Sequence, residues 1–243
     1  MKNAVRRLSG TGTALVLLTG AALSGCSGLL HSTARPEQVY YLRAPSANGT
    51  DGSGVATGAG NSAALVPPAS LRVSHPQTSP GLDSPHIMLV QSDHRMNFFA
   101  GSRWPSASSD VIESLLVQTL RASGAWASVE DTASPFPSDY LLQTSMRRFD
   151  ADYTAGAAAP VVHVVIDCMI GRGEGRDVIA NFTVSGSAPA AANRLSEVVA
   201  AFEQASGAAL TSLASQAAQA VHDDEERRTH GGRNPAPASA PGS

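Results

Sequence analysis

The sequence has few cysteines, few aromatic residues and little charge. Only two of its 243 residues are cysteine, Cys26 and Cys168, and aromatic residues make up 5%. If Cys26 is modified, Cys168 alone can form no intramolecular disulfide, even in an oxidising compartment. Charged residues make up 15% and the net charge is −3. This balance argues against a nucleic-acid-binding protein, because such a protein would carry a basic stripe.

The sequence also has no long hydrophobic run and no catalytic motif. Its most apolar stretch, residues 12–23, is uncharged but has only about 12 residues, whereas a helix needs roughly 20 to cross a bilayer core. No Gly-x-x-x-x-Gly-Lys-Ser/Thr, His-Glu-x-x-His or Gly-x-Ser-x-Gly motif occurs. We therefore expect no enzyme, with no catalytic residue, no metal and no cofactor.

The stretch that organises the chain is residues 23–26, with the sequence Leu-Ser-Gly-Cys. A basic start (Lys2, Arg6, Arg7), the apolar run and this small-residue site follow one another in the order of a secretory signal. A cysteine after a leucine and two small residues looks like the lipobox of a bacterial lipoprotein. The resemblance implies cleavage between Gly25 and Cys26 and lipidation of the Cys26 thiol. The alternative is an ordinary signal peptide, or a short membrane span, with an incidental cysteine.

Lipidation of Cys26 would make the protein a membrane protein without a membrane-spanning segment. Each buried methylene contributes about 0.8 kcal/mol, and a second acyl chain turns marginal membrane binding into stable anchoring. Ser27 follows the cysteine. In Gram-negative lipoproteins an aspartate at that place marks inner-membrane retention. Resemblance to that rule implies a palmitate-bearing protein on the outer membrane, facing the periplasm.

Composition divides the chain into several segments. We expect a signal peptide over residues 1–25, a tether over 26–35 and a folded domain over 36–222. Residues 46–64, rich in Gly, Ser, Thr and Ala, cannot bury enough apolar area to offset their ordering entropy. They are interpreted as an insertion within the domain, because the strand before them is too short to be stable alone. Residues 223–243 are predicted to be a disordered tail.

Hydrophobic periodicity predicts an α+β domain. The clearest strand is 161–170, whose even positions are all apolar and include Cys168. One helix is predicted over 110–123, with Asp110 and Glu113 as a capping-box-like pair and Gly124 as its stop. The other elements follow from the same patterns: strands 37–43, 71–73, 87–90, 95–99, 126–129, 139–149 and 178–185, and a helix over 195–221. This order indicates a mainly antiparallel sheet with both helices on one face and its last three strands in a meander.

Three candidate chemical groups have simpler structural interpretations. The glycine-rich run 171–175 could cradle a phosphate, but it leads into a strand, so a hairpin turn is favoured. Cys168 could be a nucleophile, but its apolar face favours core packing. His163 and Asp167 share a strand face about 13 Å apart, beyond hydrogen-bond reach, which favours a surface histidine.

Two further groups could serve either packing or binding. Two interpretations of Arg147 and Arg148 are open: solvated charges at a sheet edge, or contacts to anionic lipid or a partner. Edge charges are favoured. Trp104 and Tyr41 could line a partner surface, but core positions are favoured for both.

Several short signatures occur in a fixed order along the chain: the lipobox ending at Cys26, Tyr40-Tyr41-Leu42, Phe98-Phe99, Arg103-Trp104, Leu115-Leu116 with Leu120, Ser123-Gly124 before Trp126, and residues 198–202 with Ala205. Their order and spacing resemble the ABC-type transport auxiliary lipoprotein family, which includes PqiC-like lipoproteins. The resemblance runs from Cys26 to about Val221 and is interrupted by the glycine-rich insertion, which is a departure from the family.

The resemblance implies a non-enzymatic, periplasm-facing lipoprotein that works beside an MCE-type ABC transporter, which moves lipids or other hydrophobic molecules across the envelope. Its partners would be the membrane, through Cys26, and the periplasmic MCE protein, with no nucleic acid and with a homo-oligomer left open. Two alternatives remain. One is a lipoprotein that regulates or helps assemble cell-wall or outer-membrane machinery. The other is a periplasmic hydrolase, which needs a nucleophile and base in contact.

Overall fold

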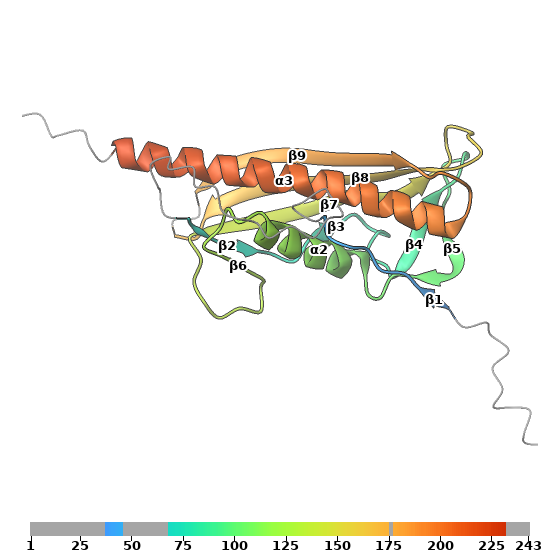
Figure 1. The fold of residues 1–243 in the computed structure, drawn as a ribbon, viewed down its shortest axis with the longest axis horizontal. Helices are drawn as coiled ribbons and strands as arrows, with labels where there is room; N and C mark the ends of the chain where they lie inside the picture. Colours follow the sequence, from blue (N-terminus) through green and yellow to red (C-terminus); the bar gives the residue numbers. More distant parts are fainter. Residues whose placement is uncertain (1–36, 46–67, 175–176, 232–243) are drawn as a thin grey trace, which may run out of the picture. The chain divides into compact units, whose positions relative to one another are not determined.

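The computed structural model describes residues 37–45, 68–174 and 177–231, which belong to one compact unit that begins at Glu37. Gly25, Cys26 and the predicted insertion at 46–64 lie outside the described residues. Within the described ranges, two helices accompany a sheet of nine strands (Figure 1). This confirms the predicted α+β class.

Three long antiparallel strands form the backbone of the sheet. They are β7 (Tyr140–Asp152), β8 (Val161–Arg172) and β9 (Val178–Pro189), and each pairs with the next. Even residues of β8 from Val162 to Ile170 are buried and odd residues are half-buried. This alternation arises because successive side chains of a strand point to opposite faces. The predicted meander is confirmed.

The shorter strands attach to β7 at different points along its length. Strand β2 (Ser70–Val73) pairs in parallel with the start of β7, where Leu71 faces Tyr140, and β4 (His86–Val90) pairs with its end, where Leu89 faces Ala151. The two attachment points, Tyr140 and Ala151, are eleven residues apart on β7, which corresponds to roughly 35 Å along the strand. The remaining strands extend these attachments: β3 (Gln77–Thr78) on β7, β5 (Met96–Arg103) on β4, β1 (Gln38–Val39) on β5 and β6 (Ser128–Glu130) on β2.

Both helices, α2 (Ser108–Ala122) and α3 (Leu195–Gly231), cover the same face of the sheet and contact each other (Figure 1). Between them and the sheet, the fully buried rings of Trp104, Phe149 and Phe202 lie with centroids 4.9–5.7 Å apart. Such aromatic clusters bury a large apolar area and stabilise the packing of the two layers. The core position predicted for Trp104 is confirmed.

The start of α2 differs from the prediction. The helix begins at Ser108, its N-cap is Ala107, and no side chain caps it. The connection between β3 and β4 fixes this start instead, because the Ser108 hydroxyl donates to the carbonyl oxygen of Leu82 at 2.5 Å. The capping role predicted for Asp110 is therefore wrong, whereas the stop is confirmed: Gly124 has φ of +65°, which favours glycine.

Three other sequence-based predictions are also wrong. The first strand has only two residues, and Tyr41 is 71% exposed rather than in the core. Helix α3 continues to Gly231, so residues 223–231 are not a disordered tail; residues 232–243 lie outside the described part.

Arg147 and Arg148 lie where β7 has β8 on one side and, among the described residues, no strand paired on the other, because β3 pairs up to Met146 and β4 pairs from Ala151. Both arginines form ion pairs with nearby carboxylates. Arg147 pairs with Asp167 on β8 at 2.8 Å, and Arg148 bridges Asp150 and Asp152 at 2.7 Å each. These ion pairs follow from the register, which brings the arginines beside carboxylates on their own and the neighbouring strand.

Neither α2 nor α3, the helices of the described residues, has an apolar stretch long enough to cross a membrane.

Candidate functional site

The residues singled out from the sequence do not form a catalytic group in the described part of the chain. Cys168 is 4% exposed, and burial raises the pKa of its thiol to about 12. A thiol with that pKa is protonated and unreactive at neutral pH. Asp167 pairs with Arg147 and accepts a hydrogen bond from the Thr183 hydroxyl at 2.6 Å, while His163 is half-buried on the same strand. The glycine-rich run from Gly171 joins β8 to β9 as the predicted hairpin connection.

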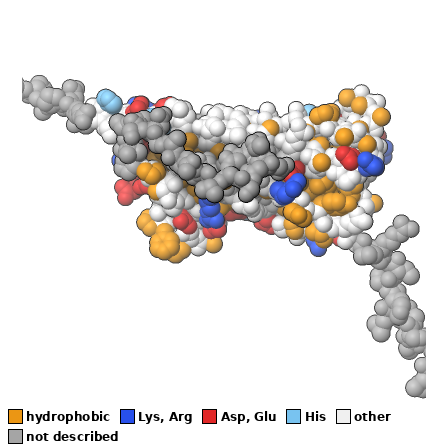
Figure 2. All heavy atoms as spheres, in the orientation of Figure 1, with side chains coloured by type: hydrophobic (Ala, Val, Ile, Leu, Met, Phe, Trp, Pro, Cys, Tyr) orange, Lys and Arg blue, Asp and Glu red, His pale blue; other side chains and the backbone are white. Residues whose placement is uncertain are grey.

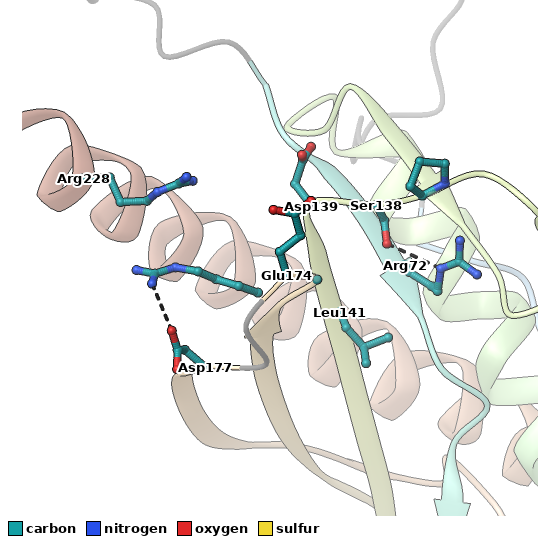
Figure 3. Close-up of a pocket in the computed structure, with 10 residues that line it drawn as sticks. Arg72, Ser138, Asp139, Leu141, Glu174, Asp177 and Arg228 are labelled. Atoms are coloured by element: carbon teal, nitrogen blue, oxygen red, sulfur yellow. Dashed lines mark hydrogen bonds and ion pairs between the residues drawn. The ribbon is translucent and has the colours of Figure 1, made fainter. Parts of the chain in front are cut away.

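A cleft of about 880 Å³ opens at the start of β7 (Figure 3). We call it the Arg72 cleft. Four elements form it: β2, the segment leading into β7, the β8–β9 connection and the end of α3. It is lined by Arg72, Pro137, Ser138, Asp139, Leu141, Arg172, Gly173, Glu174, Asp177 and Arg228.

Arg72 holds one wall of this cleft in place through hydrogen bonds to uncharged groups. Its guanidinium donates to the carbonyl oxygens of Ser134, at 3.0 Å, and Phe136, and to the Ser138 hydroxyl at 3.4 Å. Planar guanidinium groups suit such divergent acceptors, because their five donors are fixed in direction. Arg72 therefore ties the loop before β7 to strand β2. This contact joins residues more than 60 positions apart and could not be predicted from a local sequence pattern.

Asp139 joins the same two strands from the other side. Its carboxylate accepts from the backbone N–H and the hydroxyl of Ser70, at 2.8 and 2.6 Å. These hydrogen bonds, reinforced by the positive charge of Arg228, hold the pKa of Asp139 below its usual value. Nearby, a Cβ at Gly173 would lie 2.2 Å from the carbonyl oxygen of Ser138. Only glycine lets the β8–β9 connection approach the cleft wall this closely.

Asp224, on the last turns of α3, docks the helix against the cleft. Its side chain is fully buried and accepts two hydrogen bonds from Arg172, at 2.9 and 2.6 Å, and one from the Tyr140 hydroxyl at 2.9 Å. The hydrogen bonds from Arg172 lower the pKa of Asp224. Burial, together with Asp224 and the neighbouring Glu225, raises the pKa of Tyr140. Bidentate arginine–carboxylate pairs of this kind give both energy and a fixed geometry.

The rim of the cleft carries charges of both signs. Arg228 pairs with Glu225 at 3.0 Å, and Arg172 also reaches Asp177 at 3.4 Å. Among the lining residues, three arginines face three carboxylates. A cleft whose rim charges balance in this way fits a charged segment of another protein.

A second polar group lies on α2. His75 Nδ1 is 2.6 Å from Glu113 Oε2 and 4.0 Å from Asp110 Oδ1, and the ligand atoms of the three lie within 4.8 Å of one another. These residue types can hold a metal ion. His75 and Asp110 are both about half exposed, and exposed groups of this kind commonly occur without a metal. We interpret the contact as a hydrogen bond between His75 and Glu113 that fastens the segment after β2 to the first turns of α2.

Comparison with known proteins identifies the fold and the family. The domain resembles a crystal structure of a Xanthomonas campestris protein assigned to DUF330, with 23% identity, a TM-score of 0.64, and coverage of 79% of this chain and 99% of that one. A second crystal structure, of an uncharacterised protein, matches with 13% identity and a TM-score of 0.52, covering 77% and 99%. At these identities the likeness shows the fold alone. No curated protein is significantly similar in sequence.

Family membership comes from the sequence itself. The family model described as ABC-type transport auxiliary lipoprotein component matches residues 54–217. This range runs from within the predicted insertion to α3 and contains β2 to β9 and α2. It confirms the resemblance carried by the signatures around Trp104, Leu116 and Phe202. The chain therefore belongs to the ABC-type transport auxiliary lipoprotein family.

Proposed function

We propose that the chain is a non-enzymatic lipoprotein of the outer membrane that serves an MCE-type ABC transporter from the periplasmic side. In this function the chain is cleaved between Gly25 and Cys26, and acyl chains on Cys26 hold it in the membrane. The transporter moves lipids or other hydrophobic molecules across the envelope. The observation that carries the proposal is the family match, because its description joins a lipoprotein to ABC-type transport.

The arrangement of the sheet supports a mechanical role. The compact unit begins at Glu37, beside β1, which pairs with β5; β5 pairs with β4, and β4 with the end of β7. The Arg72 cleft lies at the start of β7, roughly 35 Å away along that strand. Strand β7, which pairs with β8 along its length, connects β4 to the cleft and makes the domain a rigid spacer. It would hold the cleft away from the bilayer, where a soluble part of the transporter can reach it.

We assign the Arg72 cleft to the partner protein. Arg72, Asp139 and Arg172 are held by hydrogen bonds within the domain, which lowers the ordering cost of binding a partner. Glu174 and Asp177 are exposed at its rim. Reversing both charges would place repulsive groups against a complementary partner while leaving the core intact.

Purification of the tagged full-length chain from its native envelope tests this proposal. We expect an MCE protein, with its permease, to copurify, and the double variant Glu174→Arg/Asp177→Arg to reduce that recovery at least fivefold. Asp223→Arg, which changes an exposed carboxylate outside the lining, is the matched control and keeps the partner. Recovery of cell-wall or outer-membrane assembly proteins in place of an MCE protein contradicts the proposal.

A further inference from the structure

Exposed apolar side chains gather at one end of the sheet. Of the six large hydrophobic residues exposed in the described ranges, four come from β5 and from β1 with the residues after it. Figure 2 shows hydrophobic side chains gathered over the part of the surface formed by β1, β4 and β5. We call these residues the apolar end: Val39 (52% exposed), Tyr41 (71%), Met96 (50%) and Phe98 (49%).

The β4–β5 hairpin holds part of this surface outward. Phe98 faces Met88 and Met96 faces Val90 across the antiparallel pair, so all four share one face. His86 stacks on Phe98 with ring centroids 4.6 Å apart. The alternate residues Leu89 and Phe99 pack against the core. Met96 and Phe98 cannot turn inward without a one-residue slip of β5, which would bring Phe99 out.

The charges beside the apolar end neutralise one another. Arg95 pairs with Asp93 at 2.5 Å, and Arg103 pairs with Glu37 at 3.3 Å. Exposed ion pairs of this kind contribute little to stability, but they leave the surface without a net charge. An apolar patch with a neutral rim suits the interface of a phospholipid bilayer, and its binding should depend little on salt.

If Cys26 is lipidated, the covalent chain attaches the bilayer at this end of the domain, closer to the apolar end than to the cleft. Cys26 lies twelve residues before Gln38, the first residue of β1. Twelve residues span at most about 40 Å, and a flexible chain of that length has an end-to-end distance of about 20 Å. Because β1 is hydrogen-bonded to β5, an acyl anchor on Cys26 would keep β5 within that distance of the lipid. At the resulting effective concentration, even a weak apolar contact is populated.

We infer that the apolar end is a lipid-contacting surface that seats the domain on the bilayer in which Cys26 is anchored. The inference rests on the proposed lipidation of Cys26. Met96 and Phe98 enter the headgroup–acyl boundary, and β7 then points the Arg72 cleft away from the membrane. The acyl chains alone fix where the protein is; the apolar end fixes how it is oriented.

The test uses full-length lipidated protein in vesicles of phosphatidylethanolamine and phosphatidylglycerol. An environment-sensitive fluorophore is attached through Ala100→Cys, an exposed position two residues beyond Phe98, and in a separate sample through Phe136→Cys beside the Arg72 cleft. The native Cys168 is buried. We expect nitroxide-labelled lipid to quench the probe at position 100 at least threefold more than the probe at position 136, in low and in high salt.

Two variants separate orientation from anchoring. Met96→Ser/Phe98→Ser should abolish quenching at position 100 while the protein still floats with the vesicles, and Asn97→Ser, between them on the strand, should leave it unchanged. Equal quenching at both probe sites overturns the inference. So does shielding of position 100 without lipid, which would indicate a second copy or a protein partner on this surface. Failure of the wild-type protein to float contradicts the anchor, and hence the proposed function, instead.

Discussion

At the scale of single residues, one glycine sets how closely α3 approaches the sheet. A Cβ at Gly186 on β9 would lie 2.0 Å from the carbonyl oxygen of Ala205, a separation that no real contact shows. The helix backbone therefore lies directly on the strand, with Ala205 and Ala209 fully buried around the contact. Small side chains on both partners make this packing possible, and any added volume must move the helix.

We predict that Gly186→Ala destabilises the protein by about 1–3 kcal/mol, the usual cost of overpacking a tight contact. Gly207→Ala, on α3 itself, is the matched control. Its Cβ would meet only Pro45 Cβ, at 3.8 Å, and alanine favours a helix over glycine by up to about 1 kcal/mol. Urea unfolding midpoints should therefore move in opposite directions for the two variants. Equal midpoints would show that α3 does not rest on Gly186.

The sequence predicted single residues where a local pattern determines the outcome. Cys168 lies in an unbroken alternation, and Gly124 directly follows a helical pattern; the structure confirms both positions. Tyr41 was assigned to the core on residue type alone. It is exposed because alternate residues of this extended segment, Tyr40 and Leu42, pack against the core and leave Tyr41 on the outer side. No property of a tyrosine in a short strand shows which face will be covered.

At the scale of elements, the end of α3 depends on a single buried carboxylate. Asp224 is hydrogen-bonded by Arg172, at the end of β8, and by Tyr140, at the start of β7. These contacts attach the last turns of a 37-residue helix to the sheet. An isolated helix end would fray, because tertiary packing supplies most of a helix's stability.

Asp224 should make stability depend on acid pH. Hydrogen bonds from Arg172 lower its pKa in the folded protein, so its contribution is fully present above the unfolded pKa of about 4. The contribution is lost as pH falls through the lower folded pKa. We predict that Asp224→Asn lowers the free energy of unfolding by about 2–3 kcal/mol at pH 7, the range for hydrogen bonds to a charged group. The difference in unfolding free energy between Asp224→Asn and the wild type should become smaller below about pH 4.

Asp223→Asn is the control for the neighbouring position, since Asp223 is exposed and bonds only Gln219 and Arg227 on its own helix among the contacts described. It should change stability by less than about 0.5 kcal/mol. Urea unfolding at pH 7, 4 and 3 measures both variants. If the difference in unfolding free energy between Asp224→Asn and the wild type stayed constant across this pH range, Asp224 would not be the group whose titration changes stability.

The elements themselves were largely predictable from the sequence, and their limits were not. Alternation over residues 161–170 and helical spacing over 110–123 identified β8 and α2 correctly. The end of α3 was missed because Asp223 and the charged residues after it have the composition of a solvated tail. Their order comes from Arg172 and Tyr140, which are 52 and 84 residues away in the chain. Sequence patterns carry no information at that separation.

At the scale of the whole molecule, the described domain has two different ends. The apolar end lies on β1 and β5, which reach β7 through β4 at its end, and the Arg72 cleft lies at its start. Neither site is a motif. The cleft joins residues from four elements, and Arg72 and Arg228 are far apart in the chain. The sequence therefore predicted the family and the anchor signal, whereas the surfaces that would meet lipid and partner required the fold.

The two ends together give the account its central claim: a lipid-anchored, catalytically inert domain presents a fixed cleft to a transporter. Everything in this claim depends on the anchor, because without it neither end has a defined direction. The family match and the chemistry of residues 23–26 both favour that anchor.

Mass spectrometry of the mature N-terminal peptide, from protein recovered in separated inner and outer membranes, tests the claim most directly. The account predicts a peptide that begins at Cys26, carries diacylglycerol and a further acyl chain, and is found in the outer membrane. Cys26→Ala should remove this species and all labelling by palmitate. An unmodified mature terminus, or an intact precursor carrying no lipid in wild-type cells, would contradict the account.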